Sequence, residues 1–196
     1  MRLIVFLLIG CSIQSAYSQH TLDSTKFKMY YFGTLLSGVQ IGCSNCTTGN
    51  QLTASAYLIN GIQLTKSFGV GIGVGADSYQ QWKTMPFFLH LSQKIAGTKN
   101  TLLLQLNSGY AWAWYDRQEN TLPNFKQNGG LMIHPALTYQ LGIEKWTMQF
   151  SVGYKNQITS TSSRFEYQSW GGIAYNETNV RNEFNRMVIQ IGFGWR

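Results

Sequence analysis

Alternation of bulky apolar side chains with small or polar ones constrains this chain more than any other feature. Residues 102–114 show it most clearly, with leucine and aromatic side chains at almost every second position and Gln, Asn, Gly and Ala between them. Residues 187–195 repeat the pattern. Because successive side chains of a β-strand point to opposite faces of a sheet, this period predicts strands and not amphipathic helices.

Segments of this kind recur along nearly the whole chain after its first residues. We expect eight strands, at about 29–41, 53–64, 68–77, 85–93, 102–114, 131–141, 146–156 and 187–195. An even number of antiparallel strands can close into an up-and-down barrel, which leaves no sheet edge unpaired.

The residues on the face opposite the bulky side chains distinguish a barrel in a membrane from a barrel in water. In 68–77 that face is a row of glycines, and in the later strands it carries Gln, Asn, Ser, Thr and His with few charges. Small and neutral polar residues fit a narrow, filled lumen, whereas a soluble barrel places charges on its outside. We predict an all-β fold, an eight-stranded antiparallel up-and-down transmembrane β-barrel with a packed polar interior; a soluble lipocalin-like barrel is the alternative.

The start of the chain has the features of a signal peptide. Arg2 precedes an apolar run at 3–9, and small residues precede a cleavage point after Ser18. We expect a signal peptide at 1–18, a short periplasmic extension at 19–27 and an outer-membrane barrel at 28–196. The alternative is a lipoprotein signal in which Cys11 becomes the acylated first residue.

Connection lengths predict an orientation in the membrane. We expect the connections at 42–52, 78–84, 115–128 and 157–183 to face outward and those at 65–67, 94–100 and 142–145 to face the periplasm, because the first set is longer on average. Because outer-membrane barrels have long extracellular loops and short periplasmic turns, we expect both termini in the periplasm. The net charge is +7, but the cations are scattered singly, which excludes nucleic acid as a partner and favours anionic surfaces such as lipopolysaccharide.

Three segments resemble a known family. Phe68-Gly69-Val70-Gly71-Ile72-Gly73-Val74-Gly75, Met85-Pro86-Phe87-Phe88-Leu89 and Ile191-Gly192-Phe193-Gly194-Trp195-Arg196 resemble the small outer-membrane β-barrel proteins of the OmpA/OmpX-like kind. The resemblance implies an integral protein of a Gram-negative-type outer membrane, inserted by barrel-assembly machinery that recognises an aromatic C-terminal strand. It specifies a fold and no activity.

Inward-facing polar residues are expected to form a lumen network. Its predicted members are His90, Ser92, Gln105, His134, Gln149, Arg186 and Gln190, together with Gln140. His90-x-Ser92 is similar to a pattern in lipid A deacylating barrels, but a nucleophilic serine needs a base and an orienting acid, and both side chains point away from lipid. Two histidines without further ligands do not make a metal site. We expect no enzyme activity, metal or cofactor.

Two features of the predicted outward loops bear on interaction. The loop 157–183 carries exposed aromatic and basic candidates for surface recognition, namely Arg164, Phe165, Tyr167, Trp170 and Tyr175, unless it folds back over the barrel mouth. Cys43 and Cys46 form a C-x-x-C, which favours a loop disulfide over redox chemistry or metal binding.

We therefore expect a non-enzymatic outer-membrane protein with a structural or surface-interaction role, whose extracellular loops bind lipopolysaccharide, another protein or a foreign surface. A narrow channel for small solutes is the alternative, and eight strands leave an interior only just wide enough for side chains. A lipid-modifying enzyme is the least favoured reading.

Overall fold

The computed structural model of the chain describes residues 28–43, 51–79, 82–115, 126–143, 145–170 and 172–196. In this part of the chain, nine strands form one antiparallel sheet: β1 (Tyr30–Cys43), β2 (Gln51–Gln63), β3 (Phe68–Tyr79), β4 (Trp82–Ala96), β5 (Thr101–Tyr115), β6 (Lys126–Asn128), β7 (Gly130–Ile143), β8 (Trp146–Ser169) and β9 (Gly172–Trp195). The predicted signal peptide 1–18, the extension 19–27 and Cys11 lie outside the described residues.

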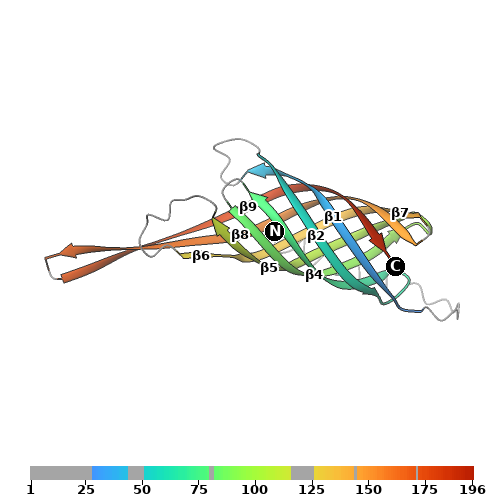
Figure 1. Ribbon diagram of the computed structural model, residues 1–196, viewed down its shortest axis with the longest axis horizontal. Coiled ribbons are helices and arrows are strands. Elements are labelled where there is room, and N and C mark those ends of the chain that lie inside the picture. The colour runs from blue at the N-terminus through green and yellow to red at the C-terminus, as the bar shows by residue number, and fades with distance from the viewer. Residues whose placement is uncertain (1–27, 44–50, 80–81, 116–125, 144, 171) are drawn as a thin grey trace, which may run out of the picture.

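The sheet closes into a barrel. Each strand from β1 to β4 pairs with the next, β5 pairs with β7, β7 with β8, β8 with β9, and β9 returns to β1. Eight strands therefore form the ring, as predicted, and the short β6 adds to the edge of β8 at Ser160–Ser162 (Figure 1).

The alternation in the sequence does set the two faces of the barrel wall. In β4, Phe88 and His90 are 1% and 2% exposed, while Phe87 and Leu89, which point outward, are 49% and 52% exposed. The other ring strands repeat this pattern, so the outer surface of the barrel is a belt of aliphatic and aromatic side chains. Such a belt is stable against lipid and not against water.

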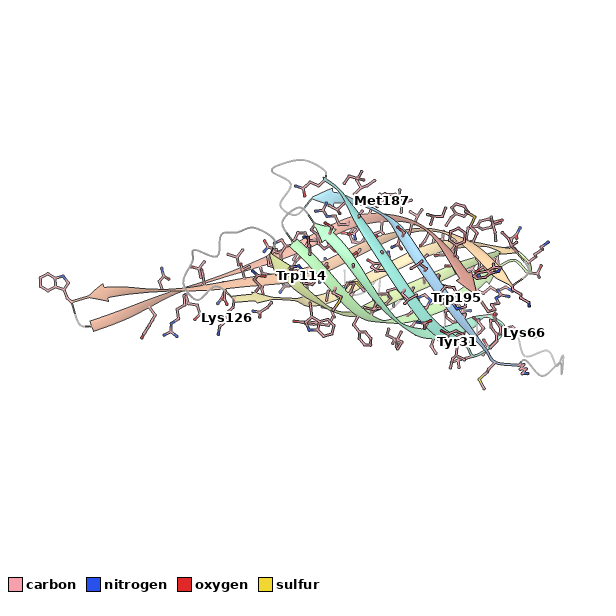
Figure 2. The ribbon with its side chains drawn as sticks, in the orientation of Figure 1. Tyr31, Lys66, Trp114, Lys126, Met187 and Trp195 are labelled. Carbon is pink, nitrogen blue, oxygen red and sulfur yellow. The ribbon has the colours of Figure 1, made fainter. Side chains whose placement is uncertain are left out.

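Aromatic residues gather at the two ends of the belt, where side chains that are part apolar and part polar are favoured. Trp114 lies toward the end that carries β6, and Tyr31 and Trp195 lie toward the opposite end (Figure 2). Among the described residues, no helix is long and apolar enough to cross a membrane.

The glycines of β3 make room for rings inside the barrel. A Cβ added at Gly73 would lie 2.3 Å from the Phe88 ring, and one added at Gly75 would lie 2.1 Å from the Tyr57 ring. Carbon atoms in contact are normally about 3.5–4.0 Å apart, so a side chain at either position would have to displace the ring beside it. The row of glycines therefore lets aromatic residues of β2 and β4 fill the lumen.

Two predicted connections are wrong. Residues 157–183 are not a loop: β8 and β9 stay paired in continuous register from Ile158↔Glu183 to Ser169↔Gly172. The segment escaped detection because it carries Ser, Thr and Asn on both faces, and strands that project beyond the lipid need no apolar face.

The predicted long connection at 78–84 is also wrong, because only residues 80 and 81 separate β3 from β4. Tyr79 pairs with Trp82 across this connection, and both side chains are buried. Burial of these two aromatic rings extends the strands past the point where the polar sequence had suggested they end.

Candidate functional site

The centre of the lumen holds a buried ion pair. Lys155 of β8 donates to the Asp77 carboxylate of β3, and both side chains are 0% exposed. The carboxylate also accepts from Tyr57 Oη at 2.8 Å, from Gln40 Nε2, and from Thr84 Oγ1 at 3.4 Å. Charges taken out of water are tolerated when they are paired and their remaining hydrogen-bonding capacity is filled, which is the arrangement here.

Tyr57 belongs to the same cluster through both its hydroxyl and its ring. Its Oη accepts from Lys155 Nζ at 2.9 Å, and the ammonium lies 5.4 Å from the ring centroid. These contacts join β2, β3 and β8 across the inside of the barrel. They fix a cross-lumen connection that strand pairing along the wall does not provide.

An apolar layer occupies the lumen beside this ion pair. Leu36, Tyr57, Ile59, Phe88 and Met132 form one buried cluster, and Phe32 packs against it. A second cluster, of Tyr79, Trp82 and Phe184, fills the lumen near the β3–β4 connection, where the rings of Tyr79 and Phe184 stack with centroids 4.5 Å apart. The interior is therefore part polar and part apolar, whereas the sequence analysis predicted a packed polar interior.

Of the eight residues of the predicted lumen network, Gln140 is half-buried and the other seven are each less than a tenth exposed. They do not form one network. Asn107 bridges the two histidines, since its Oδ1 accepts from His90 Nδ1 at 2.7 Å and its Nδ2 donates to His134 Nδ1 at 3.4 Å. Thr138 Oγ1 donates to Gln105 Oε1 at 2.9 Å and lies 2.9 Å from Ser151 Oγ. These three residues form a separate group.

The remaining predicted members make local contacts. Gln149 Nε2 donates to Thr34 Oγ1 at 3.3 Å, and Gln190 Nε2 donates to Ser55 Oγ at 3.2 Å. Arg186 donates to the carbonyl of Gly42 and, at 3.1 Å, to that of Gln51. These bonds tie β1, β2, β8 and β9 together where the barrel closes.

His90 and Ser92 are not arranged as a base and a nucleophile. The His90 imidazole is bonded to Asn107, and the Ser92 hydroxyl donates to the Gly69 carbonyl at 3.4 Å. Both side chains are buried in the lumen, away from the lipid that a deacylating enzyme must reach. Within the described residues, no three His, Cys, Asp or Glu side chains gather as metal ligands.

The surface-recognition candidates lie on a projecting hairpin, which we define as residues 158–169 of β8 and 172–183 of β9. Figure 1 shows it extending far beyond the barrel at the end opposite the C-terminus. Arg164 stacks on Tyr175 with its guanidinium 3.7 Å from the ring centroid, and Trp170 in the turn is fully exposed. The backbones of Phe165 and Tyr167 lie on β8.

The predicted disulfide joins one described residue to one outside the described part of the chain. Cys43 is the last residue of β1, where its backbone pairs with Asn185 of β9, and Cys46 lies outside the described residues.

Comparison with known proteins supports the fold. No family model matches the sequence, and no curated protein sequence does. The crystal structure of Neisserial surface protein A superposes with a TM-score of 0.57 at 7% identity, covering 86% of this chain and 99% of that one. The crystal structure of the outer membrane protein OprG from Pseudomonas aeruginosa superposes with a TM-score of 0.58 at 13% identity, covering 85% and 94%.

Identities this low show the fold alone. The closed ring of eight strands, the apolar outer belt and these superpositions together define the chain as a small β-barrel of the outer-membrane type.

Sequence reasoning missed the ion pair at the centre of the lumen. Alternation does contain a signal for it, because Asp77 follows the inward glycines of β3 and Lys155 has the same phase as Ser151. Both charges were therefore predictable as inward-facing. That they meet depends on the stagger of strands 78 residues apart in the chain, which alternation within one strand does not reveal.

Proposed function

We propose that the protein is a non-enzymatic outer-membrane barrel that holds the projecting hairpin outside the cell as a binding surface. The observation that carries the proposal is the length of β8 and β9. Each has 24 residues, whereas the other ring strands have 12 to 15. A tilted strand crosses a membrane with about 9–11 residues, so the wall of the barrel does not require this extension.

The reach of the hairpin suits contact with large partners. Twelve residues of each strand, at about 3.3 Å per residue, carry its tip roughly 40 Å beyond the last residues that pair with the rest of the ring. Its exposed side chains include Trp170, Tyr175 and Arg164, and Trp, Tyr and Arg are the residue types that most often dominate binding energy at protein interfaces.

The interior of the barrel favours a structural anchor for the hairpin over a channel for small solutes. The buried Asp77–Lys155 pair and the two apolar clusters occupy the lumen between its ends. Purified protein in planar bilayers is expected to show no reproducible open steps. Such steps would contradict a filled lumen and favour the narrow channel.

The orientation is tested by an epitope tag inserted at Trp170. Because long connections of outer-membrane barrels face outward, antibody is expected to label intact cells without permeabilisation. Labelling only after the outer membrane is opened would place the hairpin in the periplasm and contradict the proposal.

Binding is tested by photo-cross-linking in living cells. A photoreactive amino acid replaces Trp170 at the hairpin tip in one variant and Phe150, which is exposed on the lipid-facing belt, in a matched control. We expect a discrete protein or lipopolysaccharide adduct from position 170 that the control does not form. The same products from both sites, or none from position 170, would contradict a binding role for the hairpin.

A further inference from the structure

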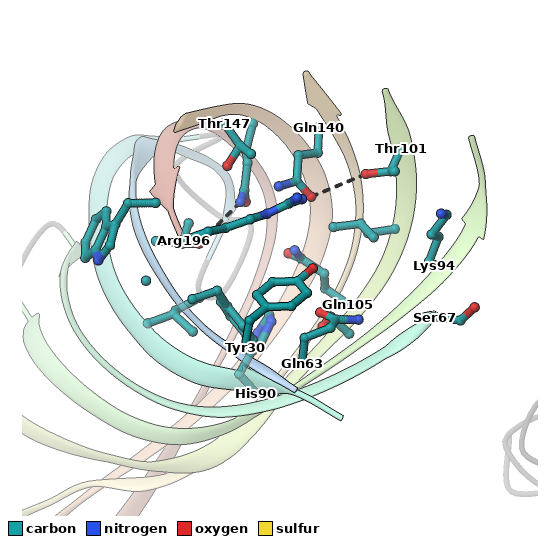
Figure 3. A pocket seen from close by; sticks show the side chains of 18 of the residues that line it. Tyr30, Gln63, Ser67, His90, Lys94, Thr101, Gln105, Gln140, Thr147 and Arg196 are labelled. Atoms are coloured by element: carbon teal, nitrogen blue, oxygen red, sulfur yellow. Dashed lines mark hydrogen bonds between the residues drawn. The ribbon is translucent and has the colours of Figure 1, made fainter. Parts of the chain in front are cut away.

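A polar cavity of about 150 Å³ opens in the lumen at the end of the barrel opposite the projecting hairpin (Figure 3). Ile59 of the central apolar cluster and Phe32, which packs against that cluster, both line it. The cluster therefore forms the inner boundary of the cavity, and access is from the end where the C-terminus lies.

Amide donors face this cavity. The side-chain carbonyl of Gln105 accepts from Thr138 at 2.9 Å and that of Gln140 accepts from Thr101 at 3.3 Å, so each glutamine retains its NH₂ group as a donor. Within the described residues, neither NH₂ group has a hydrogen-bond partner. Gln149, 4% exposed, also lines the cavity, and its Oε1 is buried without a partner.

Among the residues that the structure describes, the charged side chains that line the cavity are all basic. They are Lys66, Lys94 and Arg196, and no described Asp or Glu side chain lines it. The Arg196 side chain lies across the mouth in Figure 3, with its guanidinium 5.3 Å from the ring centroid of Tyr30.

The acidic residues that the structure describes lie elsewhere. Asp77 is neutralised by Lys155 on the far side of the apolar cluster, Glu177 and Glu183 belong to the projecting hairpin, and the backbone of Glu166 lies on β8. Asp23, Asp116, Glu119 and Glu144 lie outside the described residues. A cleft lined by a single sign of charge and bounded by low-dielectric walls concentrates counter-ions, which here are anions.

We propose that this cavity binds a small oxyanion, a phosphate or carboxylate that enters from the C-terminal end of the barrel. A cavity of about this volume holds a ligand of roughly six non-hydrogen atoms. The anionic oxygens accept from the amides of Gln105 and Gln140 and face the cationic rim. A protonated oxygen, as in hydrogen phosphate, donates to Gln149 Oε1. The site goes beyond the proposed role of the hairpin and does not depend on it.

The test uses the full chain, refolded in zwitterionic detergent and titrated with inorganic phosphate, acetate or glycerol. Sodium chloride keeps the ionic strength constant, and NMR follows the side-chain amides and the Trp195 indole, which lines the cavity. We expect saturable shifts at these groups with phosphate or acetate and none with glycerol. Saturation with phosphate alone or acetate alone identifies which oxyanion the site takes. Equal saturation with glycerol, or no saturable shift, would leave only a water-filled cavity and overturn the proposal.

Charge variants of one strand provide the matched comparison. Lys94→Gln is expected to weaken oxyanion binding about fivefold or more, the factor for one charge contact in a water-like environment, and Lys94→Arg is expected to preserve binding. Lys83→Gln, at the opposite end of β4, is expected to leave binding unchanged. Equal weakening by Lys83→Gln and Lys94→Gln would show general attraction by net charge and refute a defined site.

Gln105→Glu supplies a second, independent variant. A carboxylate inside the cavity is expected to abolish saturable binding of both anions, because like charges repel strongly in a low-dielectric site. A gel-mobility assay confirms that the variant barrel is folded before titration. Unchanged binding in a folded Gln105→Glu barrel would overturn the proposal.

Discussion

The buried ion pair makes the most direct stability prediction. Asp77→Asn leaves the Lys155 ammonium in the lumen without a counter-charge, and Lys155→Met leaves the carboxylate in the same position. Both side chains are 0% exposed, so water cannot relieve either charge without entering the lumen. Breaking one partner of such a pair typically costs about 3–5 kcal/mol, which lowers the folding equilibrium constant by about a hundredfold to several thousandfold.

The double variant Asp77→Asn/Lys155→Met separates this cost from loss of shape. It keeps the volume of both side chains and leaves an acceptor for Tyr57 and Gln40, but it removes both charges. Replacing a buried pair by uncharged groups of similar volume is often neutral or stabilising, so the double variant is expected to recover most of the loss.

Urea unfolding of the barrel refolded into phospholipid vesicles, followed by tryptophan fluorescence, measures these free energies. The exposed pair of Arg181 and Glu183, whose N and O atoms lie 2.9 Å apart, is the control, because Arg181→Ala is expected to cost less than about 1 kcal/mol. If the single variants cost no more than Arg181→Ala, or if the double variant costs the sum of the two, the lumen is hydrated and the reasoning fails.

Three further predictions concern other parts of the barrel. Gly73→Ala is expected to destabilise it by about 1–3 kcal/mol by displacing the Phe88 ring, and Phe88→Leu in the same chain is expected to restore part of this in urea unfolding. Asn107→Leu is expected to cost about 1–3 kcal/mol, because it leaves His90 buried without its partner; a smaller cost would show that water replaces the amide. Replacement of residues 163–178 by an Asn-Gly turn is expected to change stability by less than about 1 kcal/mol, because the described residues of that segment pair only with one another; a larger loss would show that the hairpin supports the ring.

Local periodicity was enough to predict the wall of the barrel. Whether a side chain points to lipid or to the lumen depends on its position within its own strand. The two-residue period of the strands therefore predicted the inward orientation of His90, Gln105 and Gln149. The same period gave eight ring strands and their antiparallel order.

The two-residue period did not predict the parts of β8 and β9 that extend beyond the barrel. The apolar alternation of β8 and β9 stops near Asn156 and Met187, although Gln157, Thr159 and Phe184 are still buried. Farther along, water contacts both faces of the ribbon, so neither face has to be apolar. Backbone pairing in register holds the projecting hairpin together. A polar sequence allows this pairing but contains no periodic pattern that predicts it. The recognition candidates Arg164, Trp170 and Tyr175 were therefore found as residues, while their rigid presentation was not.

The sequence by itself determined the period, the apolar belt and the small, uncharged character of much of the inner face, because each depends on neighbours within one strand. Only the tertiary structure decided which inward residues meet across the lumen. The stagger of the closed ring brings Asp77 to Lys155, the glycines of β3 beneath the rings of Tyr57 and Phe88, and four glutamines around one cavity. These contacts join strands far apart in the chain, and closure of the barrel sets their relative heights.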